Sequence, residues 1–267
     1  MTIPDSEIAR RAASIRRRCI MMCRGRGQGY VGQGLALADL MAALYFDEFR
    51  RTTDDEFVDR LILSTGHSAI ALYAALGELG LYADKELGTY GMDGSRIEES
   101  PLAGLPGFHI TGGSLGQGLS QAVGFALADR LKGSDARTFC LISDGELQEG
   151  QIWEAAMSAG HYGLGSLVVL VDNNGMQADG DTSQVMTVEP VDDKFTAFGF
   201  RAERVDANDL PALRAALART RDNDGCPHAL ICTTLPGNGS PTLEAYEKVH
   251  YVRATDDVWQ RALSEIQ

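Results

Sequence analysis

The sequence has too few basic residues for a protein that binds nucleic acid or acidic membranes. Its 24 lysines and arginines face 37 aspartates and glutamates, which gives a formal net charge of -13 at pH 7. Because phosphate backbones and acidic lipids are bound through basic patches, this balance argues against both kinds of partner. A small anion could still bind through backbone amides or through a metal ion.

Cysteines and long apolar runs are also scarce. The five cysteines are odd in number and none forms a C-x-x-C pair, so neither a disulfide framework nor a zinc site is indicated. Cys19 and Cys23 lie four residues apart on an expected helix, and we attribute them to core packing. No apolar run approaches the roughly 18 residues that a membrane span needs, and the N-terminus has no signal-peptide pattern. We therefore expect a cytoplasmic protein.

Apolar segments and helical patterns alternate along the chain. Strands are predicted at residues 60–64, 138–142, 166–171, 201–205 and 229–233. Helices are predicted at about 5–22, 37–46, 69–79, 111–128, 148–161 and 211–219. This order, with nearly continuous apolar strands, predicts an α/β fold: a parallel sheet with helices on both faces.

Two segments do not fit this alternation, and none divides the chain. Residues 25–34 are too rich in glycine for regular structure, and residues 84–108 are expected to form a long connection. We see no linker or internal repeat. Residues 1–267 are therefore expected to form a single domain, because α/β domains reach this length without splitting.

The polar groups that follow two of the strands are the first candidates for chemistry. The strand at 138–142 runs into Ser143-Asp144-Gly145, and the strand at 166–171 runs into Asp172-Asn173-Asn174. A right-handed crossover brings the two strand ends to the same edge of the sheet, where ligands bind.

Asp144 and Asn174 would then supply an incomplete set of hard oxygen ligands. Such a set suits Mg²⁺ or Ca²⁺, whose remaining positions are filled by phosphate and water. The alternative is that both are simple turn residues, and the residues alone favour that interpretation.

A family resemblance supplies further support. The segment S-D-G-E-L-Q-E-G-Q-I-W-E-A-A, followed by D-N-N at 172–174, resembles the thiamine diphosphate motif of transketolases. The similarity continues in order through D-R-L-I-L-S-T-G-H-S, L-P-G-F-H-I-T-G-G-S-L-G-Q-G-L and H-Y-V-R-A-T-D-D. One departure is Ser143, which stands where the motif has its first glycine.

The resemblance implies the thiamine-diphosphate-binding fold and, within it, the diphosphate domain alone. The pyrimidine-binding domain is then expected on a separate chain, as in split transketolases. The implied partner is that second subunit, in an α2β2 heterotetramer, and the chain alone should be inactive.

The cofactor and metal roles carry over position by position. The resemblance implies that Asp144, the Asn174 side chain and the Met176 carbonyl hold the metal ion. It places residues of two loops against thiamine diphosphate, namely Gly113, Ser114, Leu115, Gly116, Gly145 and Glu146.

Three catalytic residues are implied in the same way. His67 resembles a histidine that touches the diphosphate and faces the reacting centre; a capping or core histidine is the alternative. His250 resembles another active-site histidine. Glu149 corresponds to a glutamate at the subunit interface, close to the partner's glutamate that activates the cofactor.

Two departures from the family pattern concern the substrate. Tyr30 stands where transketolases have the histidine of G-H-P-G, and Ser100 replaces the histidine of G-H-P-E. A tyrosine hydroxyl can donate a hydrogen bond, but its pKa near 10 makes it a poor proton acceptor at neutral pH. We therefore expect carbon-carbon bond chemistry on a ketose or a 2-oxo acid, with an atypical donor or acceptor.

Three alternatives to a two-carbon ketol or acyl transferase exist. The first is a decarboxylating enzyme of 2-oxo acids, either an acyl transferase or an acyloin synthase. The second is an inactive homologue kept for binding or regulation. The third, a nicotinamide-binding protein, is disfavoured because no G-x-G-x-x-G lies between an early strand and helix.

Overall fold

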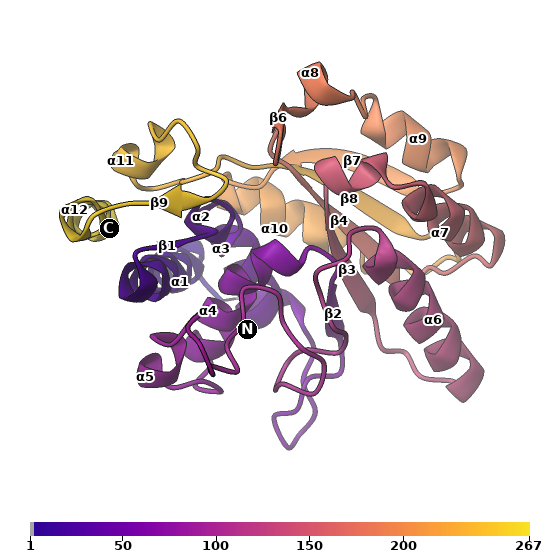
Figure 1. The fold of residues 1–267 in the computed structure, drawn as a ribbon. Coiled ribbons are helices and arrows are strands. Elements are labelled where there is room, and N and C mark those ends of the chain that lie inside the picture. Colours follow the sequence, from indigo (N-terminus) through magenta and orange to yellow (C-terminus); the bar gives the residue numbers. More distant parts are fainter. Residues whose placement is uncertain (1–2) are drawn as a thin grey trace.

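The centre of the protein is a five-stranded parallel sheet, seen in a computed structural model that describes residues 3–267 (Figure 1). Its strand order is β2-β3-β4-β8-β7. The strands are β2 (Arg60–Leu63), β3 (Thr138–Ser143), β4 (Leu167–Asn173), β7 (Arg201–Asp206) and β8 (His228–Thr233). All five predicted strands are present, and the parallel arrangement confirms the expected α/β class.

Helices cover both faces of the sheet and create two hydrophobic cores. One face packs against α1 (Asp5–Arg26), α3 (Ala38–Ala43), α4 (Ala69–Glu78) and α10 (Leu210–Arg219). The other packs against α6 (Gln117–Lys132), α7 (Gly150–His161) and α9 (Val191–Ala197). Successive strand residues alternate between the two cores, as the pleat requires. Both faces of β3 and β4 are therefore buried, which explains their continuous apolar sequence.

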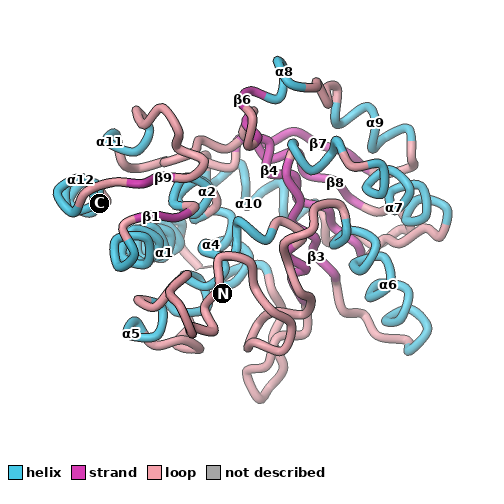
Figure 2. The backbone as a smooth tube through the Cα atoms, in the orientation of Figure 1, coloured by secondary structure: helices cyan, strands magenta, loops and turns pink. Residues whose placement is uncertain are grey.

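Further helices and strands lie beside this central layer, and of these α2 (Val31–Ala36) is completely buried (Figure 2). The others include α5 (Asp84–Leu87), α8 (Thr182–Val185), α11 (Pro241–Glu244) and α12 (Asp256–Glu265). Two antiparallel pairs lie outside the main sheet: β1 (Gln28–Gly29) with β9 (Val252–Arg253), and β5 (Met176–Gln177) with β6 (Gly180–Asp181).

The glycine-rich segment corrects one prediction. Residues 25–34 are not irregular, because α1 extends through Arg26 and is followed by β1 and the start of α2. The glycines allow close approach rather than disorder. A Cβ at Gly32 would lie 2.2 Å from the carbonyl oxygen of Val249, so only glycine lets these two segments touch.

Two helix boundaries also differ from the predictions. The helix expected from residue 111 begins at Gln117, because Gly113 and Gly116 adopt φ values of 121° and 81° that no helix contains. The helix expected over 37–46 is α-helical only over Ala38–Ala43. A single π-helical turn, Leu44–Glu48, follows it directly. Residues 84–108 form the expected connection, interrupted only by α5.

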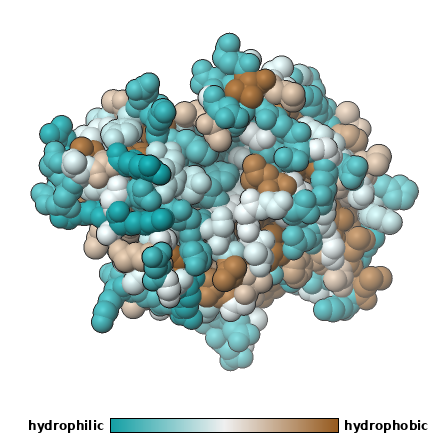
Figure 3. Space-filling model, viewed as in Figure 1, coloured by the Kyte–Doolittle hydropathy of each residue, from teal (hydrophilic) through white to brown (hydrophobic). Residues whose placement is uncertain are grey.

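The surface and the cysteines agree with the composition. Cys19 and Cys23 are fully buried, as predicted. Figure 3 shows hydrophobic side chains in separate small groups among hydrophilic ones, one group lying over α8, where Val185 and Met186 are exposed. Within residues 3–267, no helix is long and apolar enough to cross a membrane.

Candidate active site

A cleft of about 480 Å³ lies at the carboxyl ends of β2, β3 and β4. Most of the residues predicted for the site line it: Tyr30, His67, Ser100, Gly113, Leu115, Gly145, Glu149, Asn174, Met176 and His250. Ser143, Gln148, Gln177, Ala178, Asp179 and Val185 complete the lining. The fold thus brings together residues from separate stretches of the chain, as the sheet topology requires.

The ends of β3 and β4 meet as predicted. Ser143 pairs with Asp172 in the ladder, and the backbone N–H of Asp144 donates to the Asp172 carbonyl at 3.0 Å. The N–H of Gly175 donates to Oδ2 of Asp144 at 2.6 Å. The Asn174 Oδ1 atom accepts from the Met176 N–H at 2.9 Å, which folds this turn back toward Asp144.

Two buried carboxyl groups lie side by side at this edge of the sheet. Asp144 is 1% exposed and Asp172 is fully buried. Burial, together with the nearby Asp172, raises the pKa of Asp144 to about 7. Burial likewise raises the pKa of Asp172 to about 6, although Asn174 and Thr234 donate hydrogen bonds to it.

This arrangement fits a divalent cation. Among the described residues, neither lysine nor arginine lines the cleft, so no side-chain cation compensates Asp144. Over residues 3–267, no three His, Cys, Asp or Glu side chains gather as a ligand cluster. The predicted ligand set contains one carboxylate and otherwise neutral oxygens, which suits a hard cation completed by phosphate oxygens and water.

Glycines form a cradle beside the carboxylate. A Cβ at Gly66 would lie 2.5 Å from the Gly113 nitrogen, and one at Gly116 would lie 2.9 Å from the Glu149 Cβ. At Gly145 a Cβ would lie 2.9 Å from the Gln177 Cβ. Of these glycines, Gly113 and Gly145 bring backbone to the cleft wall, and backbone N–H groups are suited to hold an anion.

Glu146 points into the protein rather than into the cleft. Its side chain is fully buried, and its carboxylate accepts from the N–H of Gly116 at 2.6 Å and from Ser64 Oγ and the Ser143 N–H. Burial raises the pKa of Glu146. The 3₁₀ turn Gly145–Gln148 directs this carboxylate into the protein, where it fastens the Gly116 turn to the end of β3. Ser114, Gly116 and Asp144 likewise do not line the cleft surface.

Tyr30, His67 and His250 form an aromatic cluster in the cleft. The Tyr30 ring centroid lies 5.7 Å from that of His67 and 5.8 Å from that of His250, and the two imidazoles are 5.3 Å apart. Burial and the neighbouring His250 lower the pKa of His67 to about 4, and burial lowers the pKa of His250. Both imidazoles are therefore predominantly neutral at pH 7. His67 follows β2 in a 3₁₀ turn and faces the cleft rather than the core.

The cluster continues toward the surface through residues that the sequence patterns did not single out. The Tyr251 ring lies 4.8 Å from that of Tyr30, and its hydroxyl donates to Glu99 at 3.0 Å. Glu99 also pairs with Arg26 at 3.0 Å. Burial and Glu99 raise the pKa of Tyr30. In the sequence, the only sign of a role for Tyr251 is its position directly after His250.

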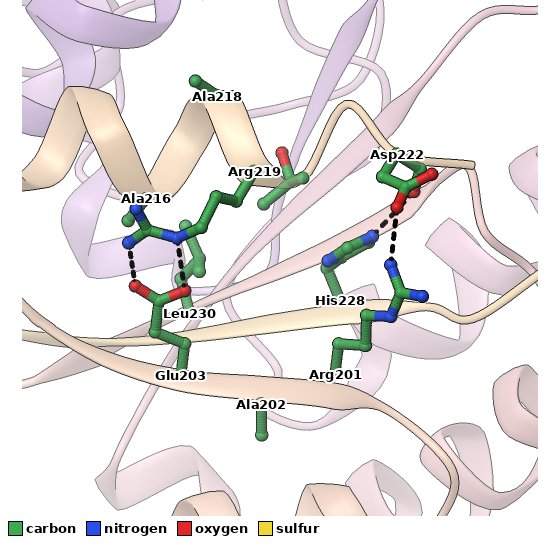
Figure 4. Close-up of a pocket in the computed structure, with 10 residues that line it drawn as sticks. Arg201, Ala202, Glu203, Ala216, Ala218, Arg219, Asp222, His228 and Leu230 are labelled. Atoms are coloured by element: carbon green, nitrogen blue, oxygen red, sulfur yellow. Dashed lines mark hydrogen bonds and ion pairs between the residues drawn. The ribbon is translucent and has the colours of Figure 1, made fainter. Parts of the chain in front are cut away.

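A second pocket, of about 430 Å³, lies at the opposite end of the sheet (Figure 4). Arg201 and His228 are the first residues of β7 and β8, and both meet Asp222 there. Arg219 pairs with Glu203 across the same pocket. Its charged side chains neutralise one another, and it contains none of the predicted residues.

Comparisons with known proteins decide the family. Residues 9–262 match the family described as transketolase, thiamine diphosphate binding domain. The chain belongs to the transketolase family. A transketolase family protein of Sinorhizobium fredii is 47% identical over 258 residues, covering 95% of this chain and 92% of that protein.

Two relatives carry more specific names. The 6-deoxy-6-sulfo-D-fructose transketolase subunit SqwG of a Clostridium species is 35% identical, over 90% of this chain and 89% of its own length. One of the subunits of the apulose-4-phosphate transketolase of Phocaeicola vulgatus is 32% identical, over 94% and 90%.

Solved transketolases share the fold. The enzyme from Leishmania mexicana superposes with a TM-score of 0.83 at 29% identity over 100% of this chain, and that from Campylobacter jejuni with 0.86 at 28%. The chain spans 45% and 43% of their respective lengths. This transketolase-family chain therefore matches the domain that binds thiamine diphosphate, over a length close to that of the relatives named as subunits.

Proposed function

We propose that this chain is the cofactor-binding subunit of a split transketolase that transfers a two-carbon ketol unit. The observation that carries the proposal is the meeting of Asp144 and the Asn174 turn at the edge of a cleft that contains His67 and His250. Residues 1–267 then form one diphosphate-binding domain, and the pyrimidine-binding domain belongs to a second subunit.

The strand ends supply the cation site. Asp144, the Asn174 side chain and the Met176 carbonyl would hold Mg²⁺ or Ca²⁺, and the cation would offset the negative charge of both Asp144 and a diphosphate. Gly145 and the backbone of 113–116 would lie along the cofactor, where the glycines leave the backbone uncovered. Glu146 would act through the Gly116 turn rather than by direct contact.

When bound, thiamine diphosphate supplies a carbon nucleophile and an electron sink. The chain's own residues bind, orient and hold protons. His67 and His250, both neutral, can donate one hydrogen bond and accept another at cofactor or substrate oxygens. They add no charge to the cleft, so they also do not repel the cation.

Glu149 is proposed as the contact with the second subunit. It is exposed at the rim of the cleft, immediately before α7, and its side chain packs against the Gly116 turn. The relatives named as subunits support a heteromeric enzyme, and we propose an α2β2 heterotetramer in the cytoplasm that is inactive without the partner.

The substrates are proposed to differ from the usual sugar phosphates. The two named relatives act on 6-deoxy-6-sulfo-D-fructose and apulose-4-phosphate, according to their names. In this chain Tyr30 and Ser100 line the cleft where the family pattern has histidines. Both changes alter hydrogen bonding to substrate hydroxyls and leave the cation site intact.

One set of experiments tests this proposal. Thiamine diphosphate and Mg²⁺ are titrated into the complex of this chain with its partner, and products are identified from a panel of ketoses, including sulfonated and branched sugars, and from pyruvate. Two-carbon transfer from a ketose is the expected result. Release of carbon dioxide from pyruvate would favour the decarboxylating alternative, and absence of cofactor binding would favour an inactive homologue.

A further inference from the structure

The side chain of Gln33 meets the catalytic candidate His250 from behind the cleft. Gln33 lies in the first turn of α2 and is 1% exposed. Its Nε2 atom contacts Nδ1 of His250. Its Oε1 atom is buried and has no hydrogen-bond partner among residues 3–267. Within the described residues, the side-chain amide of Gln33 therefore makes its hydrogen bond to His250.

The backbone holds the two residues together. A Cβ at Gly32 would lie 2.2 Å from the Val249 carbonyl oxygen, and the N–H of Gly237 donates to the Gly32 carbonyl at 3.1 Å. The residue before Gln33 is therefore pressed against the residue before His250. The backbones that carry Gln33 and His250 are thus in direct contact beside the pair of side chains.

A neutral imidazole has two tautomers, and the partner of one nitrogen decides which is present. An amide N–H at Nδ1 requires that Nδ1 accept the bond, so the proton resides on Nε2. Nδ1 is engaged with Gln33 behind the ring, and Nε2 is left for the cleft that His250 lines.

From this geometry we propose that Gln33 is a positioning residue that fixes His250 as the Nε2–H tautomer. His250 then presents an uncharged hydrogen-bond donor to the cleft. This inference rests on the proposed function for its catalytic meaning, because an Nε2–H donor serves a diphosphate or substrate oxygen. The inference goes beyond that function because it assigns the tautomer of His250 to the Gln33 amide, which does not itself line the cleft.

A fixed tautomer of His250 matters here because, among the described residues, neither lysine nor arginine lines the cleft. Oxygen atoms of an anion need donors, and a histidine that fluctuates between tautomers would present a lone pair to them for part of the time. Locking the tautomer removes that repulsion. Burial already lowers the pKa of His250, so the ring remains neutral while it donates.

Nitrogen-15 NMR of histidine-labelled full-length chain tests the tautomer without any cofactor. The chain has five histidines, and the His250 resonances are assigned by their loss in His250→Asn. In the native chain Nε2 is expected to be protonated and Nδ1 not. Gln33→Met keeps an unbranched side chain without a hydrogen-bond donor and should give a mixture of tautomers. Gln33→Glu in its ionised form can only accept, and should place a proton on Nδ1.

A second readout connects the tautomer to the cleft. In the complex with the partner and Mg²⁺, Gln33→Met should weaken binding of thiamine diphosphate or of substrate by roughly five- to tenfold, the effect of one lost hydrogen bond. Near-ultraviolet circular dichroism controls for folding.

The outcomes separate the two proposals. A protonated Nδ1 in the native chain, or an unchanged tautomer in both Gln33→Met and Gln33→Glu, overturns the role of Gln33 whatever the enzyme does. The tautomer of the native chain is measured independently of whether any Gln33 variant folds. The expected tautomers in a chain that binds no thiamine diphosphate with its partner would instead uphold the positioning role and overturn the proposed function.

Discussion

The N–H of Gly175 donates to Oδ2 of Asp144 at 2.6 Å and so fastens the turn after β4 to the turn after β3. The bond accounts for one of the two carboxylate oxygens, and the N–H of Gly145 donates to the other at 2.8 Å. These donors fix the orientation of the carboxylate but carry no full positive charge. The same bonds direct the remaining lone pairs, which would preorganise Asp144 for the proposed cation.

Asp144→Asn should abolish Mg²⁺-dependent binding of thiamine diphosphate and with it activity. The amide preserves shape but removes the only anionic ligand proposed, so affinity should fall more than the roughly 10- to 100-fold typical of an outer-shell change. Isothermal titration of the subunit complex measures this. Asp179→Asn is the matched control, because Asp179 lines the same cleft and is exposed. Undiminished affinity in Asp144→Asn would remove Asp144 from the ligand set.

Glu146→Ala should destabilise the chain itself. The change leaves the N–H groups of Gly116 and Ser143 and the Ser64 hydroxyl without their acceptor. We expect the free energy of unfolding to fall by about 2–3 kcal/mol, since each buried unpaired group is costly. Urea denaturation measures the loss. Exposed Glu154 on α7 provides the control, where Glu154→Ala should change stability by less than about 0.5 kcal/mol. Equal effects would mean that the Glu146 carboxylate is not structural.

The sheet, and the edge of the sheet where the site lies, could be predicted because the features that determine them can be read from short stretches of sequence and their order. Strands β3 and β4 are buried on both faces, so their apolar runs are unambiguous. Convergence of Asp144 and Asn174 follows from the parallel pairing of β3 with β4, because the carboxyl ends of adjacent parallel strands lie at the same edge of a sheet. Both predictions need only the order of elements, not the positions of individual side chains.

The contacts that the sequence could not supply depend on distant or directional detail. Gln33 and His250 are separated by 217 positions, and no periodicity relates them. The family resemblance placed Glu146 beside the diphosphate, but it could not show that a 3₁₀ turn points the carboxylate inward, toward the N–H of Gly116. Glycine-rich sequence suggested irregular backbone at 25–34, whereas close packing against Val249 orders it.

Asp59 should make stability depend on acidity through an ion-pair network at the amino end of β2. Arg50 donates to it at 2.8 Å, and the side chain and N–H of Arg137 donate at 3.1 and 2.8 Å. Burial opposes ionisation, but these donors outweigh it and hold the pKa of Asp59 below its usual value. The ionised carboxylate therefore favours the folded state above the unfolded pKa of about 3.9, and this contribution is lost as the pH falls toward the lower folded value.

Asp59→Asn consequently should lower the free energy of unfolding by about 3 kcal/mol at pH 7 and by less below pH about 4. Urea titrations at several pH values provide the measurement. Asp135→Asn is the control, because Asp135 also pairs with Arg50 but its side chain is 84% exposed. A penalty for Asp59→Asn that grows toward acid would reverse the assigned sign.

Tyr30→His should change which substrates are used more than how tightly thiamine diphosphate binds. The Tyr30 ring packs against His67, His250 and Tyr251 at the cleft wall, and it supplies none of the proposed cation ligands. A histidine is smaller and can accept a proton near neutral pH, so kcat/KM for ordinary sugar phosphates should rise relative to the native substrate by about tenfold or more. Tyr30→Phe keeps the ring, removes the hydroxyl and should lose native activity without gaining the new preference. Competition assays with paired ketose substrates give the ratio directly, and an unchanged ratio in Tyr30→His would place the residue outside the substrate path.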